Sequence, residues 1–143
     1  MTPTPRGSTG AEKKPRGPRL TPVRKAALTV ARALDALKGE EITVLDVGAV
    51  SPIAEIFVLA TGANPRHVKA LAEESVRALR ALEIRPASVD GAEQGYWAVV
   101  DYGPLVVHLF QPKAREYYDL EMLWGDGKKI RWKAPRKAEA AAE

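Results

Sequence analysis

The spacing of apolar residues predicts a helix near the start of the chain, between Thr21 and Gly39. Apolar positions recur every three or four residues, which places them on one side of a helix. They are Val23, Ala27, Val30, Leu34 and Leu37. Thr21 suits the N-cap, Pro22 suits the first helical position, and Gly39 provides a stop.

A second helix follows two runs that are typical of strands. The runs Ile42–Val47 and Ala54–Gly62 are rich in β-branched and apolar residues, which favours extended structure. Asn64 and Pro65 then repeat the pattern of cap and proline. The apolar stripe of this helix is Val68, Leu71, Val76, Leu79 and Leu82, and Pro86 stops it. The residues after the stop, 87–89, favour a short strand.

The stretch Gly95–Pro112, GYWAVVDYGPLVVHLFQP, predicts two strands around a tight turn. A two-residue turn, either Tyr102-Gly103 or Gly103-Pro104, gives the strands two distinct faces because side chains alternate; a three-residue loop would break this grouping. One face is apolar and suits a core under helices: Tyr96, Ala98, Val100, Leu105, Val107 and Leu109. The other face groups Trp97, Val99 and Asp101 with Val106, His108 and Phe110.

The order of these elements predicts one α/β domain. A third helix begins at Pro112 and runs to about Leu123. Helices alternating with strands in this order imply a mixed β-sheet flanked by helices. The pattern leaves the order of the strands in the sheet open.

Both ends of the chain read as tails around a domain at residues 21–124. Residues 1–20 are rich in Pro, Gly, Thr, Lys and Arg and have little apolar surface to bury, which predicts disorder. Residues 125–143 are similar and are expected to be flexible, although Ile130 and Trp132 could dock locally.

The tails carry the positive charge of the chain. The net charge is +4 over residues 1–20 and +3 over residues 125–143, whereas residues 21–124 carry −3. A domain that binds nucleic acid is expected to carry a basic patch on its folded body. Here only the tails are suited to RNA phosphates.

The composition excludes several kinds of site. The chain has no cysteine and only two histidines, His67 and His108, which are 41 residues apart. A site with thiolate ligands, or with three histidines, is therefore impossible, and we expect no metal or cofactor. The sequence has neither a signal-like apolar run at its start nor about 18 consecutive apolar residues, so we expect a cytoplasmic protein without a membrane span.

Two features leave an enzyme open as the alternative. The strand–turn–helix stretch Gly62–Arg66 could hold an anion with the N–H groups of the helix and with Arg66, as in a nucleotide-binding or nucleotidyl-transfer enzyme, although an ordinary connection looks the same. Nucleotidyl transfer also needs paired carboxylates, and Asp46, Asp90 and Asp101 lie on different strands or strand ends. Asp101 and His108 could form an acid–base pair, but no motif places a nucleophile beside them.

The stretch Arg115–Trp124, REYYDLEMLW, adds candidates for an interface. On a helix, Tyr117, Leu120 and Trp124 would lie along one side and suit core packing. Tyr118 and Glu121 would lie on another side, where no core role is evident. Aromatic residues with charged neighbours are typical of the centre of an interface.

Together these stretches resemble the ribosomal silencing factors, also called Iojap-like proteins. The resemblance spans residues 25–126 and is carried by ITVLDV, SPIAEIFVLATG, NPRHVKALAEE and DGAEQGYWAVVDYGPLVVHLFQPKAREYYDLEMLWGD. It implies a topology similar to that of nucleotidyltransferases without catalytic carboxylates, and no enzymatic activity. It also implies binding to the large ribosomal subunit through its ribosomal protein number fourteen, which blocks joining of the small subunit and represses translation under nutrient limitation.

The resemblance further implies a homodimer when the chain is free. We expect the contact with the ribosomal protein to use Trp97 and Trp124 as apolar anchors, Tyr118 and His108 as hydrogen-bonding groups, and Asp101 and Glu121 as partners for basic residues. Tyr102 is expected at the rim of this surface. The basic tails are expected to contact rRNA.

Overall fold

The computed structural model describes residues 21–52, 54–118 and 128–133. Its elements, in chain order, are α1 Pro22–Ala36, β1 Glu40–Asp46, β2 Ile56–Thr61, α2 Pro65–Arg80, β3 Ser88–Asp90, β4 Trp97–Asp101, β5 Leu105–Phe110, α3 Pro112–Tyr118 and β6 Lys128–Lys129. The strands form one six-stranded sheet in the order β3-β4-β5-β2-β1-β6. Strands β2 and β5 are parallel, and the other neighbours are antiparallel. The predicted α/β domain with a mixed sheet flanked by helices is confirmed.

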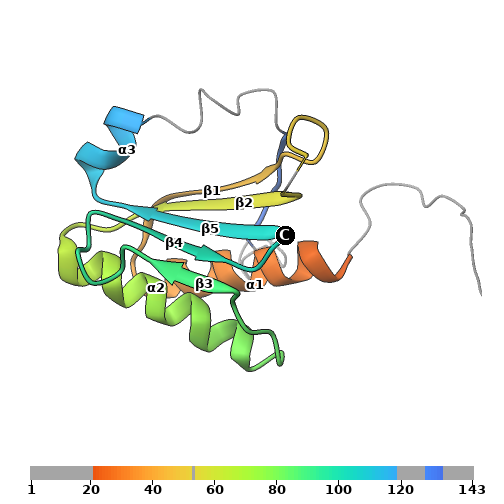
Figure 1. The fold of residues 1–143 in the computed structure, drawn as a ribbon, viewed down its shortest axis with the longest axis horizontal. Helices are drawn as coiled ribbons and strands as arrows, with labels where there is room; N and C mark the ends of the chain where they lie inside the picture. Colours follow the sequence, from red (N-terminus) through yellow and green to blue (C-terminus); the bar gives the residue numbers. More distant parts are fainter. Residues whose placement is uncertain (1–20, 53, 119–127, 134–143) are drawn as a thin grey trace, which may run out of the picture.

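The helices divide between the two faces of the sheet (Figure 1). The long helices α1 and α2 cover one face, called here the helix face, and the short α3 lies over the other, called here the α3 face. The two faces therefore differ in how much regular structure packs on them.

None of the helices in the described part of the chain has the length and the apolar character that a membrane span requires.

Both long helices begin where the sequence predicts, at a side-chain cap followed by proline. The Thr21 hydroxyl accepts a hydrogen bond from the Arg24 N–H at 3.1 Å, and the Asn64 side chain accepts one from the His67 N–H at 2.8 Å. The end of α1 differs in detail from the prediction, because Lys38 rather than Gly39 takes the left-handed conformation, with φ 67°.

The main core lies between the two long helices and the sheet. Leu34 of α1 and Leu71 and Leu79 of α2 are fully buried there. They pack on residues that alternate along the strands: Val44, Ile56, Val58, Ala60, Ala98, Val100, Leu105, Val107 and Leu109. A smaller apolar cluster lies on the α3 face and includes Leu45, Phe57, Leu59, Phe110 and Ala114.

The hairpin of β4 and β5 has the two-residue turn Gly103-Pro104, which is one of the two predicted alternatives. The Tyr102 N–H donates to the Leu105 carbonyl at 2.8 Å and closes this turn. Val99 then lies opposite His108, and Trp97 lies opposite Phe110, so the predicted grouping of the outer face is confirmed. Tyr96 is the exception on the core face: it precedes β4 and is 43% exposed.

Residues 128–133, part of the predicted C-terminal tail, join the far edge of the sheet. Lys128 and Lys129 pair with Asp46 and Leu45 of β1. Ile130 and Trp132 pack against the main core, which is the local docking that their apolar character suggests. The third helix is described as far as Tyr118, and its predicted continuation to Leu123 lies outside the described residues.

Candidate partner-binding face

Four rings from three neighbouring strands form a cluster on the α3 face. Phe57 comes from β2, Trp97 from β4, and His108 and Phe110 from β5. The rings of Trp97 and Phe110 stack with centroids 5.4 Å apart, and Phe57 meets His108 edge to face at 4.9 Å. This aromatic cluster arises because β2 pairs with β5, which brings Phe57 beside Val106, two residue pairs along the ladder from His108 and on the same face.

Trp97 and His108 are joined by a hydrogen bond across the hairpin. The indole Nε1–H of Trp97 donates to Nδ1 of His108 at 3.2 Å. An indole nitrogen can only donate, so Nδ1 carries no proton and the neutral ring must be protonated at Nε2. His108 is 8% exposed, and its Nε2 has no hydrogen-bond partner in the described part of the chain.

Burial keeps His108 neutral. Desolvation of the ring lowers the pKa of His108 to about 4, because burial disfavours the charged imidazolium. The negative charge of Asp101 acts in the opposite direction but is the weaker influence. His108 is therefore an uncharged ring within the aromatic cluster near neutral pH.

Asp101 stabilises the turn rather than pairing with His108. Its Oδ1 accepts a hydrogen bond from the Gly103 N–H at 2.7 Å, as in an Asx turn. Along the ladder Asp101 lies opposite Val106, whereas His108 lies opposite Val99. Since His108 Nδ1 is bonded to Trp97 and Asp101 to Gly103, the two side chains do not form the acid–base pair that the sequence left open.

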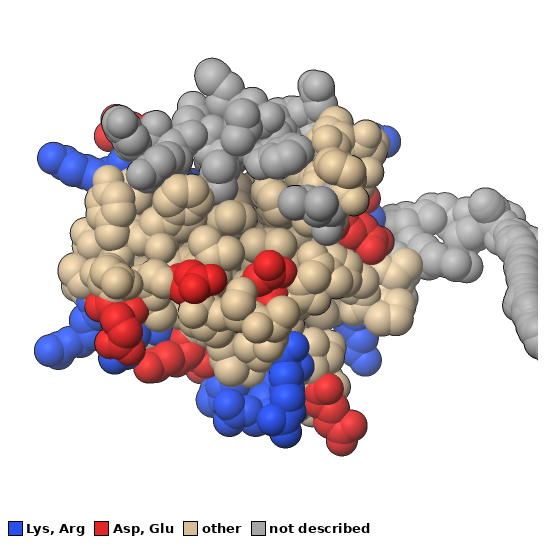
Figure 2. All heavy atoms as spheres, viewed as in Figure 1, with Lys and Arg blue, Asp and Glu red and all other residues tan. Residues whose placement is uncertain are grey.

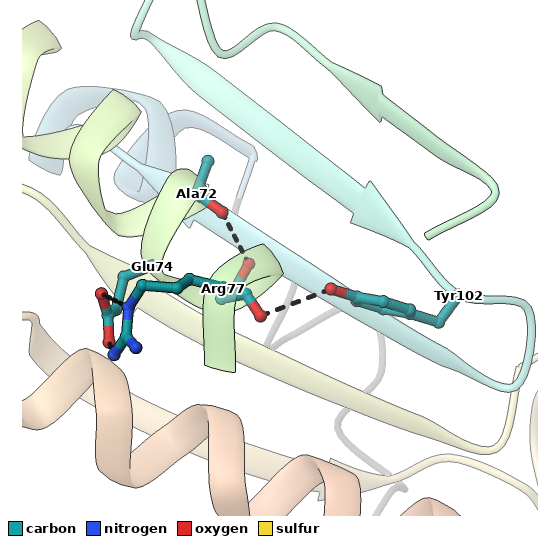
Figure 3. A network of polar contacts seen from close by, with 5 residues as sticks. Ala72, Glu74, Arg77 and Tyr102 are labelled. Atoms are coloured by element: carbon teal, nitrogen blue, oxygen red, sulfur yellow. Dashed lines mark hydrogen bonds and ion pairs between the residues drawn. The ribbon is translucent and has the colours of Figure 1, made fainter. Parts of the chain in front are cut away.

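Tyr102 lies on the opposite side of the sheet. Its ring packs against the main core, and its hydroxyl donates to the Ser75 carbonyl of α2 at 3.4 Å (Figure 3). Burial raises the pKa of Tyr102, and the hydrogen bond opposes that shift. Alternation sends the residue after Asp101 toward the helix face, so Tyr102 and Trp97 lie on opposite faces, and a place for Tyr102 at the rim of an interface stays a prediction.

The expected contact residues differ in how much surface they expose and in whether the structure describes them. Trp97 and Asp101 are half-buried, and His108 is buried, so only the first two offer substantial surface. Tyr118 is the last residue of α3. Glu121 and Trp124 lie outside the described residues. Their part in an interface stays a prediction.

Arg115 is a buried polar residue of this face that the sequence pattern did not single out. It is 8% exposed, and its guanidinium donates to the hydroxyls of Thr61 at 3.0 Å and Thr43 at 3.3 Å. These bonds tie α3 to β2 and β1. The signal was absent from the sequence because Thr43 and Thr61 become neighbours only when β1 pairs with β2.

The Gly62–Arg66 turn is occupied by its own side chains. The Asn64 side chain accepts from the His67 N–H, and His67 Nδ1 accepts from the Ala63 N–H, both at 2.8 Å. Gly95 also packs against the start of α2, where an added Cβ would lie 2.6 Å from the Cα of Pro65. These contacts use the N–H groups of Ala63 and His67, and they are those of an ordinary strand-to-helix connection.

The candidate carboxylates are dispersed over the sheet. Asp46 ends β1, Asp90 ends β3 and Asp101 ends β4. Asp46 lies 3.8 Å from Arg24 of α1 in an ion pair, whereas Asp101 bonds to the turn. Within the described ranges, no three His, Asp or Glu side chains are grouped closely enough to hold a metal ion.

Solved structures share this fold. A crystal structure of a Chromobacterium violaceum protein superposes with a TM-score of 0.71 at 33% identity, covering 80% of this chain and 94% of that one. A structure from Bacillus halodurans gives a TM-score of 0.64 at 30% identity, covering 75% of this chain and 98% of that one.

Sequence relatives agree with the structural ones. A profile described as ribosomal silencing factor during starvation matches residues 21–143. Proteins named ribosomal silencing factor RsfS are similar to this chain: that of Chromobacterium violaceum is 38% identical over 67% of this chain and 79% of its own length, and that of Bacillus subtilis is 35% identical over 67% and 81%. A mouse protein named mitochondrial assembly of ribosomal large subunit protein 1 is 32% identical over 59% of this chain and 38% of its own length.

The fold and these comparisons define a mixed-sheet α/β protein of the ribosome-associated class. The chain belongs to the ribosomal silencing factor family.

Proposed function

We propose that this protein binds the large ribosomal subunit through its ribosomal protein number fourteen and sterically blocks joining of the small subunit. Translation would then fall when nutrients are limiting. Membership in the ribosomal silencing factor family supports this proposal, as does the name of the mouse relative, which refers to the large subunit.

The observation that carries the proposal is the aromatic cluster together with Asp101, which ends β4 next to the hairpin turn. Trp97 offers part of a large ring that is stacked on Phe110 and so is held rigidly. Rigid aromatic residues lose little conformational entropy on binding, which suits them as anchors. Asp101 adds a negative charge that is fixed by its bond to Gly103.

The distribution of charge on the domain fits a basic protein partner. Residues 21–124 carry a net charge of −3, and the four cations of residues 128–133 lie beyond β1, at the opposite edge of the sheet from β3 and β4. Figure 2 shows one side of the domain, on which some acidic side chains lie within a broad uncharged area, while others lie with the basic ones around its margins. Complementary charge would raise the association rate and orient the partner more than it would raise the affinity.

Silencing by this route requires no chemistry. A folded body at a subunit bridge blocks joining by its volume alone, as long as its free concentration exceeds the dissociation constant. The capped Gly62–Arg66 turn and the separate partners of Asp101 and His108 support a non-catalytic role. We further propose that the protein is cytoplasmic and that it is a homodimer when free. Light scattering on a sizing column would test the dimer by measuring its molar mass.

Sedimentation on a sucrose gradient tests the proposed function. Purified protein is mixed with separated bacterial large and small subunits at a magnesium concentration that permits joining. We expect the protein to travel with the large subunit alone and the fraction of joined ribosomes to fall as protein is added. The proposal fails if the protein stays at the top of the gradient, or if it travels with large subunits while joining is unchanged. Binding of a labelled nucleoside triphosphate without binding of subunits would favour the enzymatic alternative.

A further inference from the structure

Residues 128–133, KKIRWK, form a basic segment that is fixed on the folded domain; it is called here the basic edge. Its first two residues are β6, which pairs with β1. Beyond them, the Ile130 N–H donates to the Val44 carbonyl at 2.8 Å. Trp132 is held twice, because its indole N–H donates to the Ile42 carbonyl at 3.1 Å and its carbonyl accepts from Arg32 of α1 at 2.8 Å.

The cations of the basic edge project away from the core. Ile130 and Trp132 pack against the main core, while Lys129, Arg131 and Lys133 are exposed. Lys129 lies opposite Leu45, a residue of the α3 face. Lys129, Arg131 and Lys133 alternate along the segment with Ile130 and Trp132, and together they are called here the row of cations.

This row is not neutralised locally. In the described part of the chain, neither Lys129 nor Arg131 has an ion pair, in contrast to Lys69, which lies 3.3 Å from Glu93. Asp46, the acid at the adjoining end of β1, is directed to Arg24 at 3.8 Å. The ammonium of Lys133 lies 5.7 Å from the centre of the Trp132 ring. Cations without nearby counter-charges attract a polyanion most strongly.

A groove of about 580 Å³ runs beside the row. Its walls are residues 42–44 of β1 and residues 129–133 of the basic edge. Apolar side chains and the Trp132 ring therefore lie beside the cations. Proteins that bind single-stranded nucleic acid combine these two features, since the cations contact phosphates and the apolar and aromatic surface contacts sugars and bases.

We propose that the basic edge binds the sugar–phosphate backbone of RNA. On the large subunit it would contact rRNA while the aromatic cluster contacts protein, and this placement rests on the proposed function. Lysines on an edge strand also discourage unwanted strand pairing. That role accounts for Lys128 and Lys129 in the two-residue β6, but Arg131 and Lys133 lie beyond it.

Binding of a labelled 12-nucleotide oligouridylate, measured by fluorescence anisotropy over a range of salt, tests the proposal without ribosomes. The triple variant Lys129→Gln/Arg131→Gln/Lys133→Gln is compared with Lys69→Gln/Arg77→Gln/Arg80→Gln, which removes the same charge from α2. Each lost phosphate contact lowers the slope of log K against log salt by about 0.7. We expect the first triple to lose about 2 from this slope and at least about tenfold in affinity, and the second to match the wild type.

Equal slopes and affinities for the wild type and the first triple would overturn the proposal, as would equal losses in both triples. If the first triple does not fold, Arg131→Gln alone should still lower the slope by about 0.7.

Pelleting with large subunits separates this proposal from the proposed function. If the wild type pellets and the first triple pellets with the same affinity and salt dependence, the basic edge has no role although the function stands. If the wild type does not pellet, the proposed function fails and the oligouridylate assay still decides the RNA contact.

Discussion

Trp97 determines which nitrogen of His108 carries the proton. The indole of Trp97 donates to Nδ1 at 3.2 Å, so the neutral His108 ring is protonated at Nε2, which has no partner in the described residues. His108, which the sequence offered as half of an acid–base pair with Asp101, is instead held in place by an aromatic neighbour. The consequence is a rigid surface around Trp97 and a buried histidine that resists protonation.

The stability of the protein should fall between pH 6.5 and pH 4 because of His108. Its pKa is lowered to about 4 in the folded state, chiefly by burial, and is about 6.5 when unfolded. Between these values the unfolded chain binds a proton that the folded chain does not, so acid favours unfolding. The contribution to stability is complete above pH 6.5, falls as the pH drops and is lost below pH 4. The loss amounts to roughly 3 kcal/mol.

Urea unfolding at pH 7.5, 6 and 5 measures this loss. His108→Gln should show a shallower dependence of the unfolding free energy on pH. His67→Gln serves as the control, because it removes the other histidine, which lies outside the aromatic cluster and is less buried than His108. A wild-type pH dependence in His108→Gln would contradict the assignment.

Replacing Trp97 by Phe should destabilise the domain through His108. Phenylalanine keeps an aromatic ring but removes the N–H, which leaves Nδ1 of His108 buried without a donor. An unsatisfied buried polar atom costs about 1–3 kcal/mol. Because Trp97 has other contacts, a double-mutant cycle with His108→Phe isolates the bond. The coupling free energy from urea unfolding should be about 1 kcal/mol, and a value near zero would show that the bond adds nothing to stability.

Two glycines with positive φ should respond differently to alanine. Gly95 has φ 70° and Gly103 has φ 92°, so both substitutions strain the backbone, by about 1 kcal/mol. An added Cβ at Gly103 meets open space, whereas at Gly95 it would lie 2.6 Å from the Cα and the carbonyl oxygen of Pro65. Thermal unfolding should show a small loss for Gly103→Ala and a loss of more than about 3 kcal/mol for Gly95→Ala. Equal losses would mean that the contact with Pro65 does not matter.

The folded domain should require residues 128–133. A chain ending at residue 127 would lose the packing of Ile130 and Trp132 on the main core and the pairing with β1. Partial burial of two large side chains contributes about 2–4 kcal/mol. A chain ending at residue 133 is the matched control and should unfold at the same urea concentration as the full chain. Equal midpoints for the two truncated chains would place the domain boundary before β6.

Local patterns predicted the parts of the fold that depend on residues near one another in the chain. The caps Thr21 and Asn64 act over three residues, and the alternation along the hairpin follows from a two-residue turn. The order of the strands depends on the parallel pairing of β2 with β5, which no local pattern encodes. The aromatic cluster was therefore predicted without Phe57. The edge strand β6 was missed because it has two residues, both lysine, and shows no alternation.

Asp101 should contribute to binding of the large subunit through its charge. Its Oδ1 also holds the turn by accepting from the Gly103 N–H at 2.7 Å, so a useful variant must keep that bond. Asn can accept in the same way, and Asp101→Asn should leave the free energy of unfolding within about 0.5 kcal/mol of the wild type. If basic residues of the ribosomal protein face Asp101, this variant should bind subunits less tightly and associate more slowly at low salt.

Asp101→Lys, which places like charges together, should lose a few kcal/mol of binding. Pelleting with large subunits measures both variants, with circular dichroism to establish that each is folded. Wild-type affinity for folded Asp101→Lys would remove Asp101 from the contact surface and leave the half-buried Trp97 as the exposed anchor of the aromatic cluster.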